Sequence, residues 1–83
     1  MKELIHFTAD WCGPCKRIAP IIEEFLINNK DVYYYKVDVD KEFNKAEIYN
    51  VQSIPTLISK IDGRIHDRVM GVVSEFTLKS MFS

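Results

Sequence analysis

The sequence predicts an α/β fold with the element order βαβαββα, in which a mixed four-stranded sheet is flanked by helices. Two patterns in the 83 residues support this prediction. Short runs of apolar, β-branched and aromatic residues alternate with longer segments whose apolar residues recur at helical spacing. The dipeptide Asp62-Gly63 separates the last two strand-like runs, which is a strong signal for a hairpin. No linker or repeat divides the chain, so we expect residues 1–83 to form a single domain.

The first half of the chain predicts a strand, a helix and a second strand. Residues 4–8 are apolar and end at a turn, which is typical of a buried strand. Residues 12–29 carry large apolar side chains on one helical face, and Pro20 within them should kink the helix by removing a hydrogen bond. Residues 32–39 are rich in β-branched and aromatic side chains. Two strands joined by a helix are expected to be parallel, with a right-handed crossover.

The second half predicts a helix, an antiparallel hairpin and a terminal helix. The first of these helices covers residues 41–49, and the hairpin strands cover residues 56–61 and 64–70. The terminal helix covers residues 74–82 and begins at Ser74, a favourable N-cap. The side chains expected in the core are Phe43 and Ala46, with Ile48 as a further candidate, and then Phe76, Leu78, Met81 and Phe82.

Both cysteines of the chain lie in the segment Trp11-Cys12-Gly13-Pro14-Cys15, directly after the first strand-like run. This places Cys12 at a helix start and at the carboxyl end of a strand, where open α/β sheets carry their sites. Unpaired backbone N–H groups and the positive end of the helix dipole favour the thiolate there. Cys12 is therefore the candidate nucleophile, and the pair predicts dithiol-disulfide exchange.

Two other interpretations of the cysteine pair are less favourable. A structural disulfide that closes so short a loop adds little stability. A zinc site needs two further ligands, and the only histidines are His6 and His66, which lack the paired spacing of a zinc finger.

Composition excludes several classes of function. A formal net charge of −1 with mixed charges argues against binding nucleic acid or an anionic membrane. No apolar stretch approaches membrane-spanning length, and a strand pattern starts too early for an export signal, so we expect a cytoplasmic monomer. A phosphate-binding glycine loop and a dinucleotide fingerprint are both missing, so we expect no bound cofactor.

Three separated segments carry a resemblance to a known family. The first is residues 7–16, Phe-Thr-Ala-Asp-Trp-Cys-Gly-Pro-Cys-Lys, followed by Ala-Pro at residues 19–20. The second is Val-Asp-Val-Asp at residues 37–40, and the third is Tyr-Asn-Val-Gln-Ser-Ile-Pro-Thr-Leu at residues 49–57, followed by Asp62-Gly63 and Gly71. Together these segments resemble the thioredoxin family, in a short form without the first strand and helix of longer members.

The resemblance implies a thioredoxin fold and reduction of protein disulfides. Cys12 would attack the substrate disulfide, and Cys15 would resolve the mixed disulfide that forms. It also implies a flavin-containing thioredoxin reductase that draws on NADPH, with neither group permanently bound to this chain. Gly13-Pro14 between the cysteines favours this assignment over the glutathione-linked glutaredoxins, in which Pro-Tyr is common.

The resemblance further implies an apolar docking surface for substrate, with a cis peptide bond at Ile54-Pro55 lying against the dithiol. The matching positions are Trp11, Gly13, Pro14, Ile54, Pro55, Met70, Gly71 and Val72. From the residues alone, an ordinary trans turn is the alternative for Pro55, and Met70 and Val72 are more typical of a core.

One position departs from the family pattern. Typical thioredoxins carry a buried aspartate just before the phenylalanine of the first matched strand, and this chain has His6 there. His6 is either a neutral proton acceptor or a core histidine without a role in the chemistry. The neighbouring lysine of the family is kept as Lys36, and Asp38 has the same strand parity. Asp38 is a candidate for the missing carboxylate or for a partner of Lys36.

Three other activities use the same kind of fold. The chain could be a glutathione-linked glutaredoxin, a disulfide oxidase or isomerase, or an interaction subunit that uses the docking surface without turnover. Gly13-Pro14 and the missing export signal favour the reductase over the oxidase. The two retained cysteines favour catalysis over interaction alone.

Overall fold

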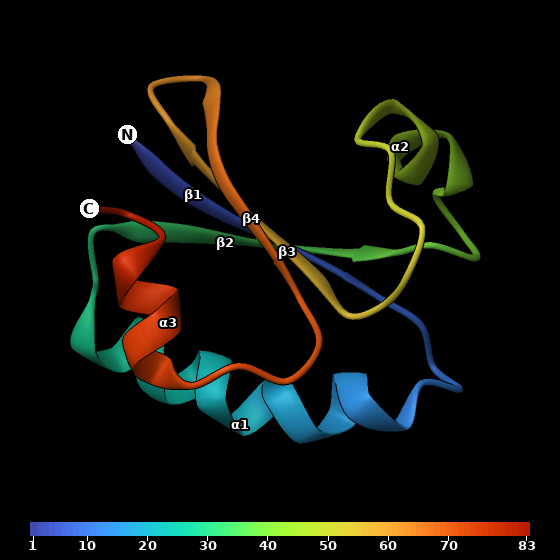
Figure 1. Ribbon diagram of the computed structural model, residues 1–83, viewed down its shortest axis with the longest axis horizontal. Helices are drawn as coiled ribbons and strands as arrows, with labels where there is room; N and C mark the ends of the chain where they lie inside the picture. The colour runs from blue at the N-terminus through green and yellow to red at the C-terminus, as the bar shows by residue number, and fades with distance from the viewer.

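The computed structural model describes residues 1–83 and has the predicted element order. The elements are β1 (Lys2–Thr8), α1 (Gly13–Asn28), β2 (Val32–Asp38), α2 (Phe43–Ile48), β3 (Thr56–Ile61), β4 (Arg64–Met70) and α3 (Glu75–Ser80). The sheet order is β2-β1-β3-β4, with β1 parallel to β2 and the other two pairings antiparallel. Helices α1 and α3 lie on one side of the sheet and α2 lies on the other (Figure 1). The predicted mixed sheet is therefore confirmed.

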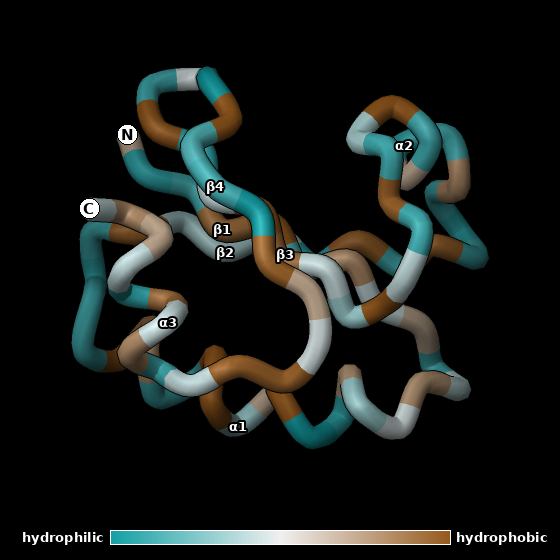
Figure 2. Tube along the Cα trace, in the orientation of Figure 1, coloured by the Kyte–Doolittle hydropathy of each residue, from teal (hydrophilic) through white to brown (hydrophobic).

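The strands divide the core into two layers because their side chains alternate between the two faces. Along β1, Leu4 faces α1 and α3, whereas Ile5 and Phe7 face α2. The first layer contains Leu4, Ile18, Ile22, Phe25, Leu57, Leu78 and Met81, and the second contains Ile5, Phe7, Val37, Ala46 and Ile58. Figure 2 shows hydrophobic segments in the strands at the centre of the molecule.

Helix α1 begins where the sequence predicts, with Cys12 as its N-cap and a proline in the first turn. Its apolar stripe of Ile18, Ile22 and Phe25 is buried against the sheet. The helix continues through Pro20, and it ends at Asn29, whose side-chain amide donates to the carbonyl of Phe25 at 2.8 Å. The buried stripe fixes the position of α1 on the sheet, and with it the position of the cysteines.

The hairpin between β3 and β4 has the predicted bounds. Asp62 and Gly63 have φ values of 52° and 83°, so both central residues are in the left-handed region, as a type I′ turn requires. Next to this turn Ile61 lies opposite Arg64, and a register shift between Ser59 and Lys60 then places Thr56 of β3 opposite Met70 of β4.

Three side chains predicted in the core are exposed instead. Phe43, Ile48 and Phe76 are 60%, 80% and 80% exposed. Both short helices have only six residues, so each presents a narrow face to the sheet. Ile48 and Phe76 each lie two positions from the buried residue of their helix, which is about 200° around the axis. Phe43 is the first residue of α2, and its side chain points back beyond the helix start.

The remaining core predictions for the two short helices are confirmed. Ala46 of α2 and Leu78 of α3 are buried, and so is Met81, the C-cap residue of α3. Phe82 is half-buried and stacks on Phe25, with ring centroids 5.9 Å apart. Ser74 is the N-cap of α3, and its hydroxyl accepts from the N–H of Thr77 at 3.2 Å.

Candidate active site

Cys12 and Cys15 form a disulfide at the start of α1, with their Cα atoms 5.3 Å apart. Cys12 has extended backbone angles and caps the helix, and the N–H of Cys15 donates to the Cys12 sulfur at 3.2 Å. That sulfur stands in for the thiolate of the reduced protein, which would accept the same hydrogen bond more strongly because it is charged. Both cysteines are buried to the same degree in the disulfide form. The helix cap, rather than exposure, therefore distinguishes Cys12 from Cys15.

Trp11 lies beside the disulfide and is 69% exposed. Its indole N–H donates to the carboxylate of Asp40 at 2.8 Å, and the backbone N–H of Asp40 donates to Asp38 at 2.9 Å. The Asp38 carboxylate thus orders the turn after β2, and the ion pair considered between Asp38 and Lys36 is not formed. Asp40 was missed as a site residue, although it ends the second segment of the family resemblance.

His6 lies in β1 on the face that α1 covers, opposite Lys36 of β2. The side chain is buried, with Nδ1 2.9 Å from the hydroxyl oxygen of Tyr34. The Nε2 atom is buried and has no hydrogen-bond partner in the protein. Burial, and secondly the charge of Lys36, lowers the pKa of His6 to about 4. His6 is therefore a neutral imidazole at neutral pH.

His6 and Cys15 line the same cavity, which has a volume of about 170 Å³. Its lining residues are His6, Thr8, Ala9, Asp10, Cys15, Lys16, Ala19, Tyr34 and Lys36. The structure thus brings His6 and Lys36 together beside Cys15, whereas Asp38 does not line the cavity. The sequence analysis did not identify Tyr34 as a site residue. It interpreted Tyr33, Tyr34 and Tyr35 only as part of the strand over residues 32–39.

We expect acid to destabilise the protein between about pH 6.5 and pH 4 because of His6. The unfolded chain takes up a proton near pH 6.5, whereas the folded chain does so only near pH 4. The unfolded state therefore binds more protons in this window, and the free energy of unfolding decreases as the pH falls. The full decrease in the free energy of unfolding is roughly 3 kcal/mol. The pKa of His6 falls from 6.5 to about 4 on folding, and each pKa unit corresponds to about 1.4 kcal/mol.

Urea unfolding of the wild type and of His6→Asn across this pH range measures the effect. The carboxylates titrate in both proteins, so the difference between the two pH slopes isolates His6. Equal slopes would contradict the prediction.

The residues assigned to the docking surface lie around the cysteine pair. The Ile54-Pro55 peptide bond is cis, as the resemblance implies, and Ile54 packs against the cluster formed by Ala9 and the cysteines. Met70 and Val72 are 60% and 45% exposed, so they belong to the surface and not to the core. Gly71 lies between them, and its N–H donates to the carbonyl of Pro55 at 2.9 Å. Of the other assigned positions, Gly13 is exposed and Pro14 is half-buried.

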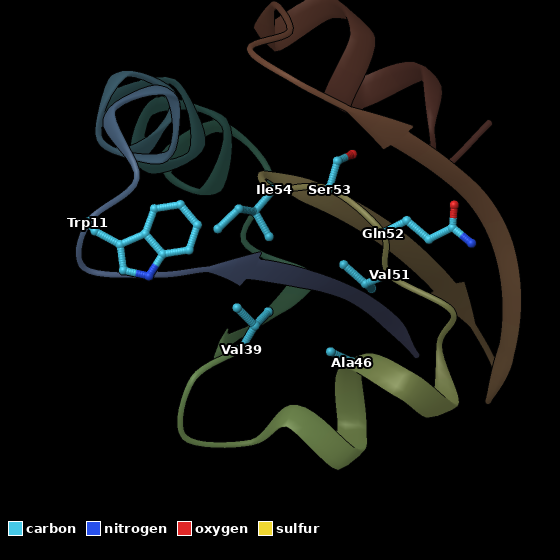
Figure 3. Close-up of a pocket in the computed structure, with 7 residues that line it drawn as sticks. All are labelled: Trp11, Val39, Ala46, Val51, Gln52, Ser53 and Ile54. Atoms are coloured by element: carbon cyan, nitrogen blue, oxygen red, sulfur yellow. The ribbon is translucent and has the colours of Figure 1, made fainter.

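A groove of about 370 Å³ extends from Trp11 along this surface. It is lined by Trp11, Val39, Ala46, Val51, Gln52, Ser53 and Ile54. Figure 3 shows Trp11 at one end and Gln52 at the other, with Ile54 between them. Of the residues that line the groove, the sequence analysis assigned only Trp11 and Ile54 to the docking surface. The signal for three of the others was the third matched segment, which contains Val51-Gln52-Ser53.

The arrangement of polar residues does not favour a metal centre. No cluster of three or more histidine, cysteine or acidic side chains could hold a metal ion. His66, the second histidine, lies in β4 and contacts the backbone carbonyl of Ser83 at 2.8 Å. No helix of this chain has the length and apolar character needed to cross a membrane.

Comparison with known proteins gives a consistent result. The family model described as thioredoxin matches residues 1–83. The thioredoxin of Mycoplasmoides gallisepticum is 40% identical over 80 residues, covering 96% of this chain and 80% of the relative. The thioredoxin of Chlamydia trachomatis is 41% identical over 80 residues, covering 96% and 78%.

Solved structures agree with the sequence comparisons. A mutant thioredoxin from Halobacterium salinarum has a TM-score of 0.87 at 38% identity, covering 96% of this chain and 70% of that one. Mitochondrial thioredoxin 3 from Saccharomyces cerevisiae, in its oxidised form, has a TM-score of 0.89 at 32% identity, covering 95% and 74%. The family uses a redox-active disulfide in place of a bound cofactor, which here is Cys12–Cys15. The chain therefore belongs to the thioredoxin family, and it is a thiol-disulfide oxidoreductase that reduces protein disulfides.

Proposed function

We propose that the two cysteines have separate roles, with Cys12 as the attacking nucleophile and Cys15 as the resolving thiol. The observation that carries this proposal is the hydrogen bond from the N–H of Cys15 to the Cys12 sulfur at the start of α1. A backbone donor and the positive end of a helix both stabilise a thiolate at Cys12. Cys15 lies inside the first turn and faces the cavity that contains His6.

The exchange proceeds in two steps. The Cys12 thiolate attacks one sulfur of the substrate disulfide, so that the Cys12–substrate bond forms and the other substrate sulfur leaves as a thiolate. Cys15 then loses its proton and attacks the Cys12 sulfur, forming the Cys12–Cys15 disulfide and releasing the second substrate thiolate. Two electrons pass from the dithiol to the substrate, and the released thiolates take up protons.

We propose that substrate docks as an extended segment across the apolar surface. Trp11, Met70 and Val72 supply exposed apolar area, and the groove supplies a recess beside the disulfide. The backbone N–H and carbonyl of Ile54 take no part in the hydrogen bonds of the sheet or the turns. They are therefore available to pair with the backbone of a substrate strand. Pro55 and Gly71 are joined by a backbone hydrogen bond that supports this edge.

The reductant that we propose is a flavin-containing thioredoxin reductase that draws on NADPH. The dithiol must be restored after each turnover, and this requires a supply of two electrons from outside the chain. We place the reaction in the cytoplasm, where such a reductant maintains thiols in the reduced state.

A coupled assay tests this function. With NADPH, a flavin-containing thioredoxin reductase and insulin as the disulfide substrate, we expect NADPH consumption to depend on the concentration of this chain. Glutathione with glutathione reductase should support much slower turnover. Equal turnover in the glutathione arm would assign a glutaredoxin, and no turnover in either arm would assign an interaction subunit.

Redox equilibration with a glutathione couple separates the reductase from an oxidase. We expect the dithiol potential to lie near or below that of the cytosolic glutathione pool. A potential well above that pool would assign disulfide formation or isomerisation as the function.

A further inference from the structure

We propose that the outer edge of β2 pairs with the same edge of a second copy of this chain, so that two molecules form a symmetric dimer with one continuous sheet. The pairing is antiparallel and centred on Tyr35, which lies opposite Tyr35 of the second copy. The inference goes beyond the proposed function, because none of the residues assigned to the docking surface lies in β2.

The two edges of the sheet differ in how well they resist pairing. The edge strands are β2 and β4. Charges and irregular register discourage pairing at an edge, and β4 has both, with Arg64, Asp67 and Arg68 along it and a register shift in its ladder. The pairing of β2 with β1 is regular over all seven residues, and β2 contains no proline. The outer edge of β2 is therefore the one that is open to another strand.

The backbone groups of β2 point alternately toward β1 and toward the open edge. The N–H of Val39, directly after β2, donates to the last carbonyl of β1 at 2.9 Å. The odd-numbered residues of β2 thus direct their backbone groups to β1. The even-numbered residues Val32, Tyr34, Lys36 and Asp38 direct theirs to the open edge.

Two of these outward groups are already paired within the chain. The N–H of Val32 donates to the turn before β2, and the carbonyl of Asp38 accepts from the turn after it. Neither Tyr34 nor Lys36 has a backbone hydrogen bond outside the ladder of β1 and β2. The groups left free at the edge are the carbonyl of Val32, the N–H of Asp38, and both groups of Tyr34 and Lys36.

Antiparallel pairing centred on Tyr35 matches these free groups one to one. Tyr34 then lies opposite Lys36 of the second copy, and the two residues exchange both of their backbone hydrogen bonds. Asp38 lies opposite Val32 of the second copy, where its N–H meets the free carbonyl. Moving the centre to Tyr34 or to Lys36 would set a free group against one that a turn already occupies. The edge is thus complementary to itself in one register.

The side chains are complementary in the same register. On the face that α2 covers, Tyr35 lies opposite Tyr35, and Tyr33 lies opposite Val37. Aromatic pairs and pairs of an aromatic with a β-branched residue are favourable across strands. Tyr33 and Tyr35 are 57% and 47% exposed, so both have apolar area left to bury. On the other face, the ring of Tyr34 lies opposite the ammonium group of Lys36.

A second copy is a suitable partner because the same patch serves both molecules, as a two-fold interface requires. A net charge of −1 per chain causes little repulsion between the copies. The paired strands are short, so the buried area is at the low end for specific interfaces. We therefore expect a dissociation constant of roughly 10 µM to 1 mM. The monomer expected from composition is then the state at low concentration.

Sedimentation equilibrium of the oxidised protein tests for the dimer. Both cysteines are joined within the chain in this form, so no free thiol can link two molecules. Between about 20 µM and about 1 mM, we expect the weight-average mass to rise from 9.7 kDa toward twice that value. A mass that stays at 9.7 kDa up to 1 mM would overturn the proposal.

Two variants locate the interface. Tyr35→Lys places two like charges opposite each other at the two-fold axis and removes the aromatic pair, so we expect the dissociation constant to rise about tenfold. Phe76→Lys is the matched control, because it adds the same charge at a side chain that is 80% exposed in α3, and it should dimerise like the wild type. Circular dichroism checks that both variants fold. A dimer of wild-type strength in folded Tyr35→Lys would overturn the pairing.

Amide hydrogen exchange tests the register at single residues. Between about 20 µM and about 1 mM, exchange at the N–H groups of Tyr34 and Lys36 should slow about two- to sixfold, as mass action predicts for the expected affinity. The N–H groups of Tyr33 and Tyr35 already bond to β1 and should exchange at rates independent of concentration. Slowing at Ile54 instead of Tyr34 and Lys36 would place the contact on the docking surface and overturn the proposal.

Reduction of insulin separates this proposal from the proposed function. Turnover is measured at about 1 µM, where the expected affinity leaves the chain monomeric. Tyr35→Lys should reduce insulin at the wild-type rate there, because Tyr35 belongs neither to the cysteine pair nor to the docking surface. Absence of turnover in the wild type would contradict the proposed function and leave the sedimentation and exchange results to decide the dimer.

Discussion

Replacing Cys12 by serine should abolish protein-disulfide reduction, with a loss of at least about a thousandfold. A serine hydroxyl remains protonated at neutral pH and cannot replace the thiolate that the start of α1 stabilises. Replacing Cys15 by serine should stop turnover differently, because attack by Cys12 still occurs but resolution is lost. Intact-mass measurement after incubation with insulin should then detect a covalent complex for Cys15→Ser and none for Cys12→Ser.

Alkylation of the reduced wild type provides the control for this assignment. At neutral pH, iodoacetamide should modify Cys12 well before Cys15, because only the thiolate reacts. Equal alkylation rates, or a trapped complex with Cys12→Ser, would reverse or remove the proposed division of roles.

The second large effect is expected from Phe7→Ala, which should lower the free energy of unfolding by about 3–5 kcal/mol. Phe7 is fully buried between the sheet and α2, and its ring lies 5.6 Å from that of Tyr49. A domain of this length has a total stability of about 4–12 kcal/mol, so the variant should be close to unfolding. Urea denaturation followed by circular dichroism measures the loss.

The same substitution should also disturb the docking groove. Val39, Val51 and Ile54 pack against the cluster that contains Phe7, and all three line the groove. We therefore expect the folded fraction of Phe7→Ala to show a higher KM for insulin. Phe76→Ala removes the same atoms from an exposed position and should change stability by less than about 0.5 kcal/mol. Equal losses in the two variants would contradict the assignment of Phe7 to the core and of Phe76 to the surface.

Local signals predicted the elements and the position of the dithiol. The Asp62-Gly63 turn fixed both strands of the hairpin, because its two residues tolerate positive φ. The capping position of Cys12 followed from the strand-like run before it and the apolar periodicity after it. These features depend on residues close in sequence, which is why the pattern alone was sufficient.

Contacts across the fold could not be predicted in the same way. The bonds from Tyr34 to His6 and from Trp11 to Asp40 join residues 28 and 29 positions apart, and both depend on how β2 is placed. The exposure of Phe43 and Phe76 depends on helices too short to bury a second large side chain. The sequence analysis left two roles open for His6. Strand parity predicts which face of the sheet His6 lies on, but it does not predict which side chains from other elements contact it.

The central place of β1 also determines the order in which the chain can assemble during synthesis. Lys2 pairs with Val32 on one side and with Ile61 on the other, so the sheet stays open along one edge until most of the chain has been made. The hairpin of β3 and β4 closes through local contacts and can form as soon as residues 56–70 have been made. When β3 pairs with β1, Leu57 and Ile58 become buried and both layers of the hydrophobic core are complete. Until then the nascent chain exposes a strand edge, which is a template for aggregation that chaperones would have to shield.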